Sequence, residues 1–205
     1  MLEMHREDPN FFNKVLWSDE SACRKDGYLN LYNLHSWQLE NPYVSREDRS
    51  QYQFKINLWC GIFNGQIVGP VELPPTLNAN NYLEFLRETL PTLFENVPSE
   101  LREVMWLQND GCPAHYGREV RAYLDEAYPG RWIGRLRPIL WPPRSPDLNP
   151  LDFFYWGAMN DKVYEKPIQN DNELRARVNI AARKISEISL RRLKSSFLRR
   201  CRACI

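Results

Sequence analysis

Hydrophobic residues in the first part of the chain fall into short runs bounded by turn residues, a pattern typical of buried strands. The runs that predict strands cover residues 15–18, 54–63, 66–73, 104–107 and 138–141. Asn64-Gly65 separates the second run from the third, and this dipeptide strongly favours a two-residue hairpin turn. These two runs are therefore expected to pair as antiparallel neighbours.

Other stretches repeat their apolar residues at the spacing of a helix. They cover residues 81–94, 116–127, 151–164 and 170–201, the last as one or two helices. The chain thus begins with strands, continues with alternating helix and strand, and ends in helices. This order predicts an α/β fold with a mixed sheet flanked by helices, whose first strands form an antiparallel meander.

Composition adds that this is an ordinary globular protein, with 43% hydrophobic and 26% charged residues. No apolar run approaches the roughly 20 residues that span a bilayer, and the N-terminus lacks the pattern of a signal peptide. We therefore expect an intracellular protein without a membrane partner. Five cysteines, an odd number, are expected to be reduced. Cys201 and Cys204 have the spacing of half a zinc site, but no second pair completes it.

Basic residues are concentrated near the C-terminus, although the net charge of the whole chain is only +1. Among them, Arg191, Arg192 and Lys194 are candidates for contacts with nucleic-acid phosphates. The alternative is a solvated amphipathic helix that packs on the sheet through residues such as Ile185 and Phe197.

Three aspartates occupy the kind of position where α/β proteins bind ligands. Asp19 and Asp110 each follow a predicted strand, and Asp152 opens a predicted helix. Carboxylates that meet at one place repel each other, and a cation relieves the repulsion. Hard oxygen ligands favour Mg²⁺ or Mn²⁺ over zinc. Two such ions roughly 3.5–4 Å apart can activate an attacking oxygen and stabilise the leaving oxygen at phosphorus.

Each of these aspartates also has a purely structural interpretation. Asp19 and Asp152 suit caps or first turns, and Asp110, within Asn-Asp-Gly, suits an Asx turn. Glu20 and Asp147 are close in sequence and are alternative ligands. The residues alone therefore predict an acidic metal site without fixing its members.

Three sequence blocks resemble the catalytic blocks of mariner-like transposases, and they occur in the same order. Residues 17–21 read Trp-Ser-Asp-Glu-Ser, residues 107–115 read Leu-Gln-Asn-Asp-Gly-Cys-Pro-Ala-His, and residues 141–152 read Trp-Pro-Pro-Arg-Ser-Pro-Asp-Leu-Asn-Pro-Leu-Asp. The third block is the most specific. Its catalytic acid stands two positions after the second proline of Ser-Pro-Asp-Leu-Asn-Pro, which is Asp152 here, and Asp147 is then structural.

The resemblance, which extends from about residue 11 to about residue 164, implies a ribonuclease-H-like fold and a catalytic triad of Asp19, Asp110 and Asp152. It implies two Mg²⁺ ions, replaceable by Mn²⁺, with Asp110 as the bridge between them. The implied chemistry is metal-dependent cleavage at a transposon end, followed by attack of the freed 3′-hydroxyl on target DNA in the nucleus. His115 and Arg144 are further candidates for DNA contacts. For His115, the alternatives are the outer layer of the site and a hydrogen bond at a helix start.

The same resemblance divides the chain into three parts. Residues 1–10 are expected to be a linker remnant, residues 11–168 the catalytic domain, and residues 169–205 a basic helical extension. Within the domain, residues 24–53 match a clamp-like loop that reaches the partner subunit in mariner-like enzymes, which implies a homodimer.

The chain departs from the mariner pattern in two ways. First, 41 residues separate Asp110 from Asp152, more than is common, and the surplus is expected around residues 128–137. Second, no segment corresponds to the paired helix-turn-helix modules that find transposon ends, so we expect a fragment or a chain that has lost specific recognition. Two alternatives stay open. One is a catalytically silent relic that only binds nucleic acid or dimerises, and the other is a nuclease acting on RNA–DNA hybrids.

Overall fold

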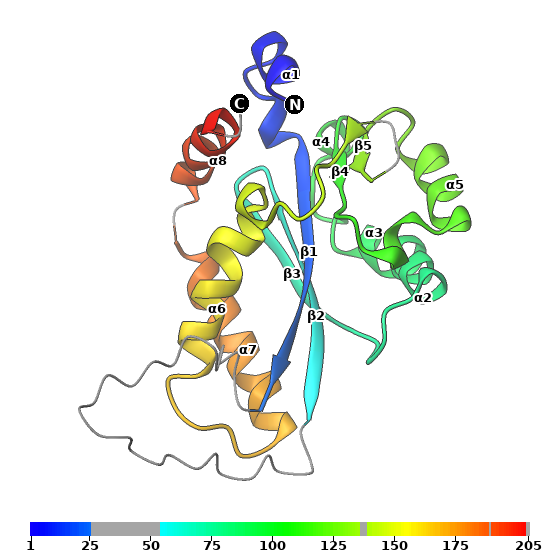
Figure 1. Cartoon of the computed structure of the whole chain (residues 1–205). Coiled ribbons are helices and arrows are strands. Elements are labelled where there is room, and N and C mark those ends of the chain that lie inside the picture. The colour runs from blue at the N-terminus through cyan, green and yellow to red at the C-terminus, as the bar shows by residue number, and fades with distance from the viewer. Residues whose placement is uncertain (26–53, 136–138, 189, 204–205) are drawn as a thin grey trace, which may run out of the picture.

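The computed structural model describes residues 1–25, 54–135, 139–188 and 190–203, apart from the side chains of Arg191 and Arg192. Its centre is a six-stranded sheet (Figure 1) with the strand order β3-β2-β1-β4-β5-β6. The strands are β1 (Val15–Arg24), β2 (Lys55–Phe63), β3 (Gln66–Leu73), β4 (Trp106–Gln108), β5 (Trp132–Gly134) and β6 (Ile139–Leu140). From residue 26 onward, the predicted loop at 24–53 lies outside the described residues, and so does the dimer contact expected of it.

The sheet is mixed, as the sequence predicts. β1, β2 and β3 are antiparallel neighbours, whereas β4 pairs in parallel with β1 and the parallel pairing continues to β5 and β6. The turn between β2 and β3 is the expected hairpin, since Asn64 and Gly65 have φ values of 47° and 72°, the left-handed conformation that such a turn requires. β5 lies in the stretch expected to hold surplus residues. The sequence pattern does not predict it, because three residues are too few to show a period.

The first strand is longer than predicted, and this changes the placement of Asp19. The predicted strand ends at Ser18, but β1 continues to Arg24 because β2 pairs with it over that whole stretch. On the other side of β1, β4 pairs only as far as Trp17. The prediction that Asp19 follows the strand is therefore wrong. Asp19 lies within β1, at a position where β1 pairs with β2 on one edge and is no longer paired with β4 on the other.

Helices cover both faces of the sheet. They are α1 (Leu2–Glu7), α2 (Ala79–Glu84), α3 (Leu90–Thr92), α4 (Ser99–Glu103), α5 (Arg118–Ala127), α6 (Trp156–Val163), α7 (Asp171–Ser186) and α8 (Arg191–Ala203). Short 3₁₀ and π turns accompany them: η1 (Phe11–Asn13), η2 (Phe85–Thr89), η3 (Pro113–Tyr116), η4 (Pro146–Leu148) and η5 (Leu151–Tyr155). The π turn η2 joins α2 to α3 and the π turn η5 leads into α6, so the helices predicted at 81–94 and 151–164 are each one continuous helical segment.

Two hydrophobic clusters fill the space between the sheet and its helices. On one face, α6 and α7 (Figure 1) contribute side chains such as Met159 and Val178, which are no more than 2% exposed. On the other face, the segment that begins with α2 and the helix α5 contribute Leu86 and Leu124, which are equally buried. The parallel strands β4 and β5 are almost wholly buried, which explains their apolar residues, whereas Leu140 of the edge strand β6 is 69% exposed.

The C-terminal helix α8 is docked onto the domain. Its Phe197, which is 3% exposed, packs against the rings of Phe12 and Trp17 at centroid distances of 4.7 and 4.6 Å. This contact fits the amphipathic interpretation of the basic segment. Along the described part of the chain, no helix combines the length and the apolarity needed to cross a membrane.

Candidate active site

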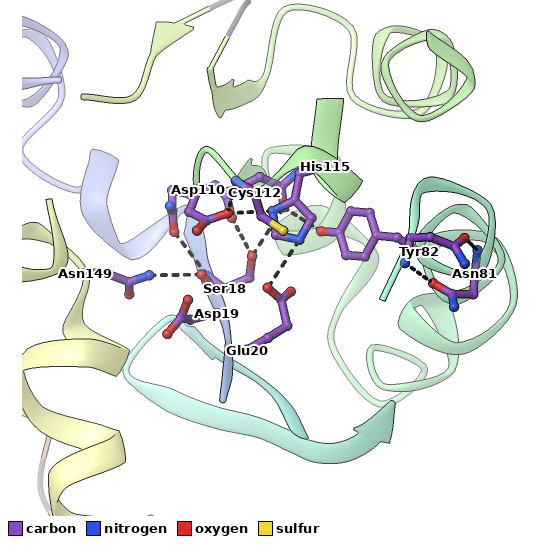
Figure 2. Close-up of polar contacts among 12 residues, drawn as sticks. Ser18, Asp19, Glu20, Asn81, Tyr82, Asp110, Cys112, His115 and Asn149 are labelled. Atoms are coloured by element: carbon purple, nitrogen blue, oxygen red, sulfur yellow. Dashed lines mark hydrogen bonds and ion pairs between the residues drawn. The ribbon is translucent and has the colours of Figure 1, made fainter. Parts of the chain in front are cut away.

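The three predicted aspartates meet in one cleft at the end of the parallel part of the sheet. β1 and β4 run in parallel with Trp17 opposite Gln108, so Asp19 and Asp110, each two residues further along, leave this pair at the same end (Figure 2). Asp152 enters from the first turn of the helical segment that begins with η5. All three residues line a cleft of about 250 Å³.

Buried polar residues hold the segments of this cleft in register. The hydroxyl of Ser18 donates to the carbonyl oxygen of Gln108 at 2.5 Å and so links β1 to the end of β4. The Asn149 amide donates to the carbonyl oxygen of Ser18 at 3.0 Å, and its Oδ1 accepts from the N–H of Leu151 at 3.0 Å. Ser18 and Asn149 are each 2% exposed, so these bonds are shielded from water. The helix that carries Asp152 is thereby fixed to the strand that carries Asp19.

Asp19 is the most perturbed acid of the three. Burial is the largest influence on its pKa, and with the negative charges of Asp152 and Glu20 it raises that pKa to about 8. The indole N–H of Trp156 donates to Asp19 Oδ2 at 2.7 Å and acts in the opposite direction. Without a cation, Asp19 therefore holds a proton at neutral pH, whereas a bound cation favours its charged form.

The pKa values of the other two acids are shifted in opposite directions. Burial, followed by the charge of Asp110, raises the pKa of Asp152 to about 6. Burial also acts to raise the pKa of Asp110, but the contact with His115 and the N–H of Cys112, which donates to Oδ1 at 2.8 Å, outweigh it and lower that pKa. Asp110 is thus the carboxylate of the three that stays charged without a cation.

His115 joins Asp110 to Glu20 inside the protein. Its Nδ1 lies 2.7 Å from Asp110 Oδ1 and its Nε2 lies 3.2 Å from Glu20 Oε2 (Figure 2). Burial acts to lower the pKa of His115, but the two carboxylates raise it well above its ordinary value. Neither ring nitrogen has a hydrogen bond of good geometry, so these are ion pairs by distance and not aligned hydrogen bonds. At 3% exposed, His115 fits the outer layer of the site better than direct contact with DNA.

The donor set of the cleft suits a hard divalent cation. Three carboxylates converge, and the raised pKa values of Asp19 and Asp152 are what uncompensated repulsion and burial produce. Their oxygens are ligands that Mg²⁺ and Mn²⁺ prefer. Of the two alternative acids, Glu20 lines the cleft but is paired with His115, whereas the residues that line the cleft do not include Asp147.

The predicted nucleic-acid contacts lie in different places. Arg144 is exposed and lines the cleft. Lys194 lies on α8, and its Nζ donates to the carbonyl oxygen of Pro9 at 2.6 Å. The side chains of Arg191 and Arg192 lie outside the described residues.

Sequence reasoning missed three residues that shape the site: Asn149, Trp156 and Tyr82. Tyr82 packs its ring 4.2 Å from the imidazole of His115 and donates its hydroxyl to Asn109 Oδ1 at 2.6 Å. Asn149 stands inside the third block, where its place just before a proline is the available signal. Trp156 and Tyr82 have no comparable signal, because an aromatic residue on a helix is usually part of the core.

Comparison with known proteins agrees with this geometry. A family model described as "DDE superfamily endonuclease" matches residues 14–175. The transposase of the transposable element Tcb1 from Caenorhabditis briggsae is 26% identical over 210 residues, which cover 96% of this chain and 69% of that protein.

Solved structures of the Mos1 transposase share the fold. A mariner Mos1 paired-end complex with Mg has a TM-score of 0.72 at 19% identity, covering 97% of this chain and 56% of that chain. The Mos1 catalytic domain with raltegravir and Mn has a TM-score of 0.66 at 15% identity, covering 98% of this chain and 88% of that chain. The chain therefore belongs to the DDE superfamily of endonucleases, as a mariner/Tc1-like transposase catalytic domain with a ribonuclease-H-like fold.

Proposed function

We propose that this domain cleaves DNA strands and transfers the freed 3′-hydroxyl end to target DNA, using two Mg²⁺ ions held by Asp19, Asp110 and Asp152. Mn²⁺ is expected to replace Mg²⁺. The observation that carries the proposal is the convergence of three carboxylates in one cleft, two of them with raised pKa values. The Mos1 complexes solved with a transposon end and with Mg or Mn support the same chemistry for this chain.

Each acid has its own part in this proposal. Asp110 would be the ligand shared by both ions, as the resemblance to mariner-like transposases implies, and it is the one acid of the three whose pKa is lowered, so that it is charged before a cation binds. Asp19 and Asp152 would supply the remaining carboxylate ligands, and Trp156 orients Asp19 through the 2.7 Å hydrogen bond. When bound, the ions activate the attacking oxygen and stabilise the leaving oxygen of the phosphodiester.

Nicking of supercoiled plasmid tests this proposal. The protein is expected to convert the plasmid to open circles in the presence of Mn²⁺ or Mg²⁺, and chelation with EDTA is expected to stop the reaction completely. No covalent protein–DNA product should form, because the acids hold metal and do not attack phosphorus. A protein that neither nicks DNA nor binds Mn²⁺ would contradict the proposal and favour the silent relic.

A wider groove leads away from the cleft and suits a DNA strand. It has a volume of about 940 Å³ and shares Asp110, Trp141 and Arg144 with the cleft. Arg135 also lines it, with its guanidinium carbon 4.5 Å from the ring centroid of Tyr116. Both arginines are exposed, and guanidinium groups bind phosphate oxygens in a bidentate manner. The strand that enters the cleft is therefore expected to follow this groove.

Arg144→Gln is expected to weaken the binding of a short DNA duplex by about five-fold, because one phosphate contact is lost. The slope of log K against log salt should fall in magnitude by about 1. Fluorescence anisotropy over a salt series measures both quantities. Arg118→Gln is the matched control, since Arg118 is an exposed arginine on α5 that pairs with Glu119 at 3.1 Å and is not part of the groove lining. Equal effects of the two substitutions would contradict the groove.

The homodimer through residues 24–53 and the nuclear location belong to the same proposal. β1 ends at Arg24 directly opposite Lys55, the first residue of β2, so the intervening segment leaves and re-enters the sheet at one point. An insertion between paired strand ends costs little loop entropy and leaves the sheet intact. This attachment is compatible with a contact to a second subunit.

A further inference from the structure

The loop after β4 gathers three side chains of different chemistry: Asp110, Cys112 and His115. One carboxylate oxygen, the thiol sulfur and one imidazole nitrogen all lie within 4.8 Å of one another. Figure 2 shows the sulfur of Cys112 beside the imidazole ring. Among the described residues this is the only group of three His, Cys, Asp or Glu side chains that comes together in this way.

The local backbone brings these ligands together within six consecutive residues. The N–H of Cys112 donates to Asp110 Oδ1 at 2.8 Å and closes a turn over Gly111. Cys112 then precedes the 3₁₀ turn η3, and the N–H of His115 donates to the carbonyl oxygen of Cys112 at 3.0 Å. Side chains three residues apart in such a turn lie on the same side. Cys112 and His115 therefore face the same way, toward Asp110.

His115 is buried without an aligned hydrogen-bond partner. It is 3% exposed, and neither ring nitrogen makes a hydrogen bond of good geometry, although carboxylates lie 2.7 and 3.2 Å away. The ring of Tyr82, 4.2 Å away, packs against the imidazole. If Nδ1 binds a metal, the Nε2 N–H still faces Glu20. A carboxylate behind a metal-bound histidine is the common arrangement that fixes its orientation.

We infer that Cys112, His115 and Asp110 form a site for a borderline divalent ion such as Zn²⁺. Thiolate and imidazole ligands select Zn²⁺ over Mg²⁺, which the three aspartates of the cleft prefer. Ligand atoms around tetrahedral Zn²⁺ lie about 3.3–3.8 Å apart, given bonds of about 2.0–2.3 Å. His115 Nδ1 and Asp110 Oδ1, which are 2.7 Å apart, would therefore separate slightly, and a pair of ligand atoms at the 4.8 Å limit would close by about 1 Å. On binding, the Cys112 thiol releases its proton, and the metal replaces the proton between Nδ1 and Asp110.

This site has a consequence for catalysis, because Asp110 belongs to both ligand sets. An ion held by Cys112 and His115 draws Asp110 away from the Mg²⁺ ions. Zn²⁺ is therefore expected to inhibit cleavage by competing for Asp110, and this expectation rests on the proposed function. The binding site itself does not depend on that function.

Titration of the metal-free protein with Co²⁺ tests the site directly. A bond between Co²⁺ and a thiolate gives a near-ultraviolet charge-transfer band that carboxylate ligands do not give. The wild-type protein is expected to develop this band with about one equivalent of Co²⁺, and Zn²⁺ should bleach it. Cys112→Ser should lose the band and bind Co²⁺ at least 10-fold more weakly. Cys201→Ser, which alters a half-buried cysteine on α8, is the matched control and should keep the band.

A second variant and the cleavage assay complete the test. Glu20→Gln is expected to weaken Co²⁺ binding by about 10-fold while the band remains. In nicking assays, the Zn²⁺ concentration for half-inhibition should rise at least 10-fold in Cys112→Ser, relative to the activity of each protein without Zn²⁺. Absence of the band in wild type, or an equal band in Cys112→Ser, would overturn the site. A protein with the band that does not nick DNA would refute the proposed function and leave the site standing.

Discussion

Replacing Asp110 by alanine is expected to reduce metal-dependent nicking by on the order of 1,000-fold or more. Asp110 is the acid whose lowered pKa keeps it charged, and its charge acts on both of the other acids. Its removal takes away the ligand assigned to both ions, so the chemical step is lost and DNA binding is kept. Initial rates of open-circle formation in Mn²⁺ measure the effect, with circular dichroism to establish that the variant is folded.

Asp147→Ala is the matched control for that experiment. Asp147 lies in the same sequence block as Asp152, but it is exposed in η4 and is not among the residues that line the cleft. Its substitution is expected to change the rate by less than about two-fold, as for most surface positions. If Asp147→Ala were inactive in nicking while Asp110→Ala remained active, the assignment of Asp110 as a metal ligand and of Asp147 as a structural residue would be contradicted.

Asp19→Asn is expected to stabilise the metal-free protein at pH 8 and to abolish its stabilisation by Mg²⁺. The pKa of Asp19 in the folded chain, about 8, lies above its ordinary value of 3.8, so the folded chain holds this proton more tightly than the unfolded chain. The stability of the metal-free wild type therefore falls as the pH rises through that interval. Asparagine carries no charge, so the variant avoids the loss. The gain is expected to be on the order of 1–2 kcal/mol, because Asp19 is partly exposed and water screens its charge.

Thermal unfolding at pH 6 and pH 8, with and without Mg²⁺, separates the two effects. At a Mg²⁺ concentration 100-fold above the dissociation constant, the wild type should gain about 2.7 kcal/mol and the variant almost nothing. The amide oxygen that Asp19→Asn introduces can still accept from the indole N–H of Trp156, so packing is matched. Identical pH dependence of the two metal-free proteins would show that repulsion among the acids does not act in this cleft.

The sheet, and three aspartates that the structure places in one cleft, could be predicted because both depend on local patterns. Short apolar runs bounded by turns predict strands, and Asn64-Gly65 has the conformation that its residue types favour. The sequence blocks that resemble mariner-like transposases single out Asp19, Asp110 and Asp152, and the structure brings these three together. The parallel register of β1 and β4 is the physical reason that two of them meet.

What could not be predicted depends on contacts between distant segments. The full length of β1 follows from its pairing with β2 and not from its own polar residues. Trp156 and Asp19 are 137 positions apart, and nothing local to either residue indicates their hydrogen bond. The ion pair of Glu20 with His115 likewise forms between distant segments, β1 and η3. Without that contact, the short spacing of Cys112 and His115 in the sequence does not by itself indicate a metal site.

Anomalous diffraction from crystals soaked in MnCl₂ tests whether Asp19, Asp110 and Asp152 hold two divalent ions. We expect two Mn²⁺ peaks in the cleft, roughly 3.5–4 Å apart, with Asp110 as a ligand of both. Asp110→Ala crystals treated in the same way should lose at least one peak. An empty cleft in the wild type at millimolar Mn²⁺, or ions held without Asp110, would contradict a two-metal site built on these three aspartates.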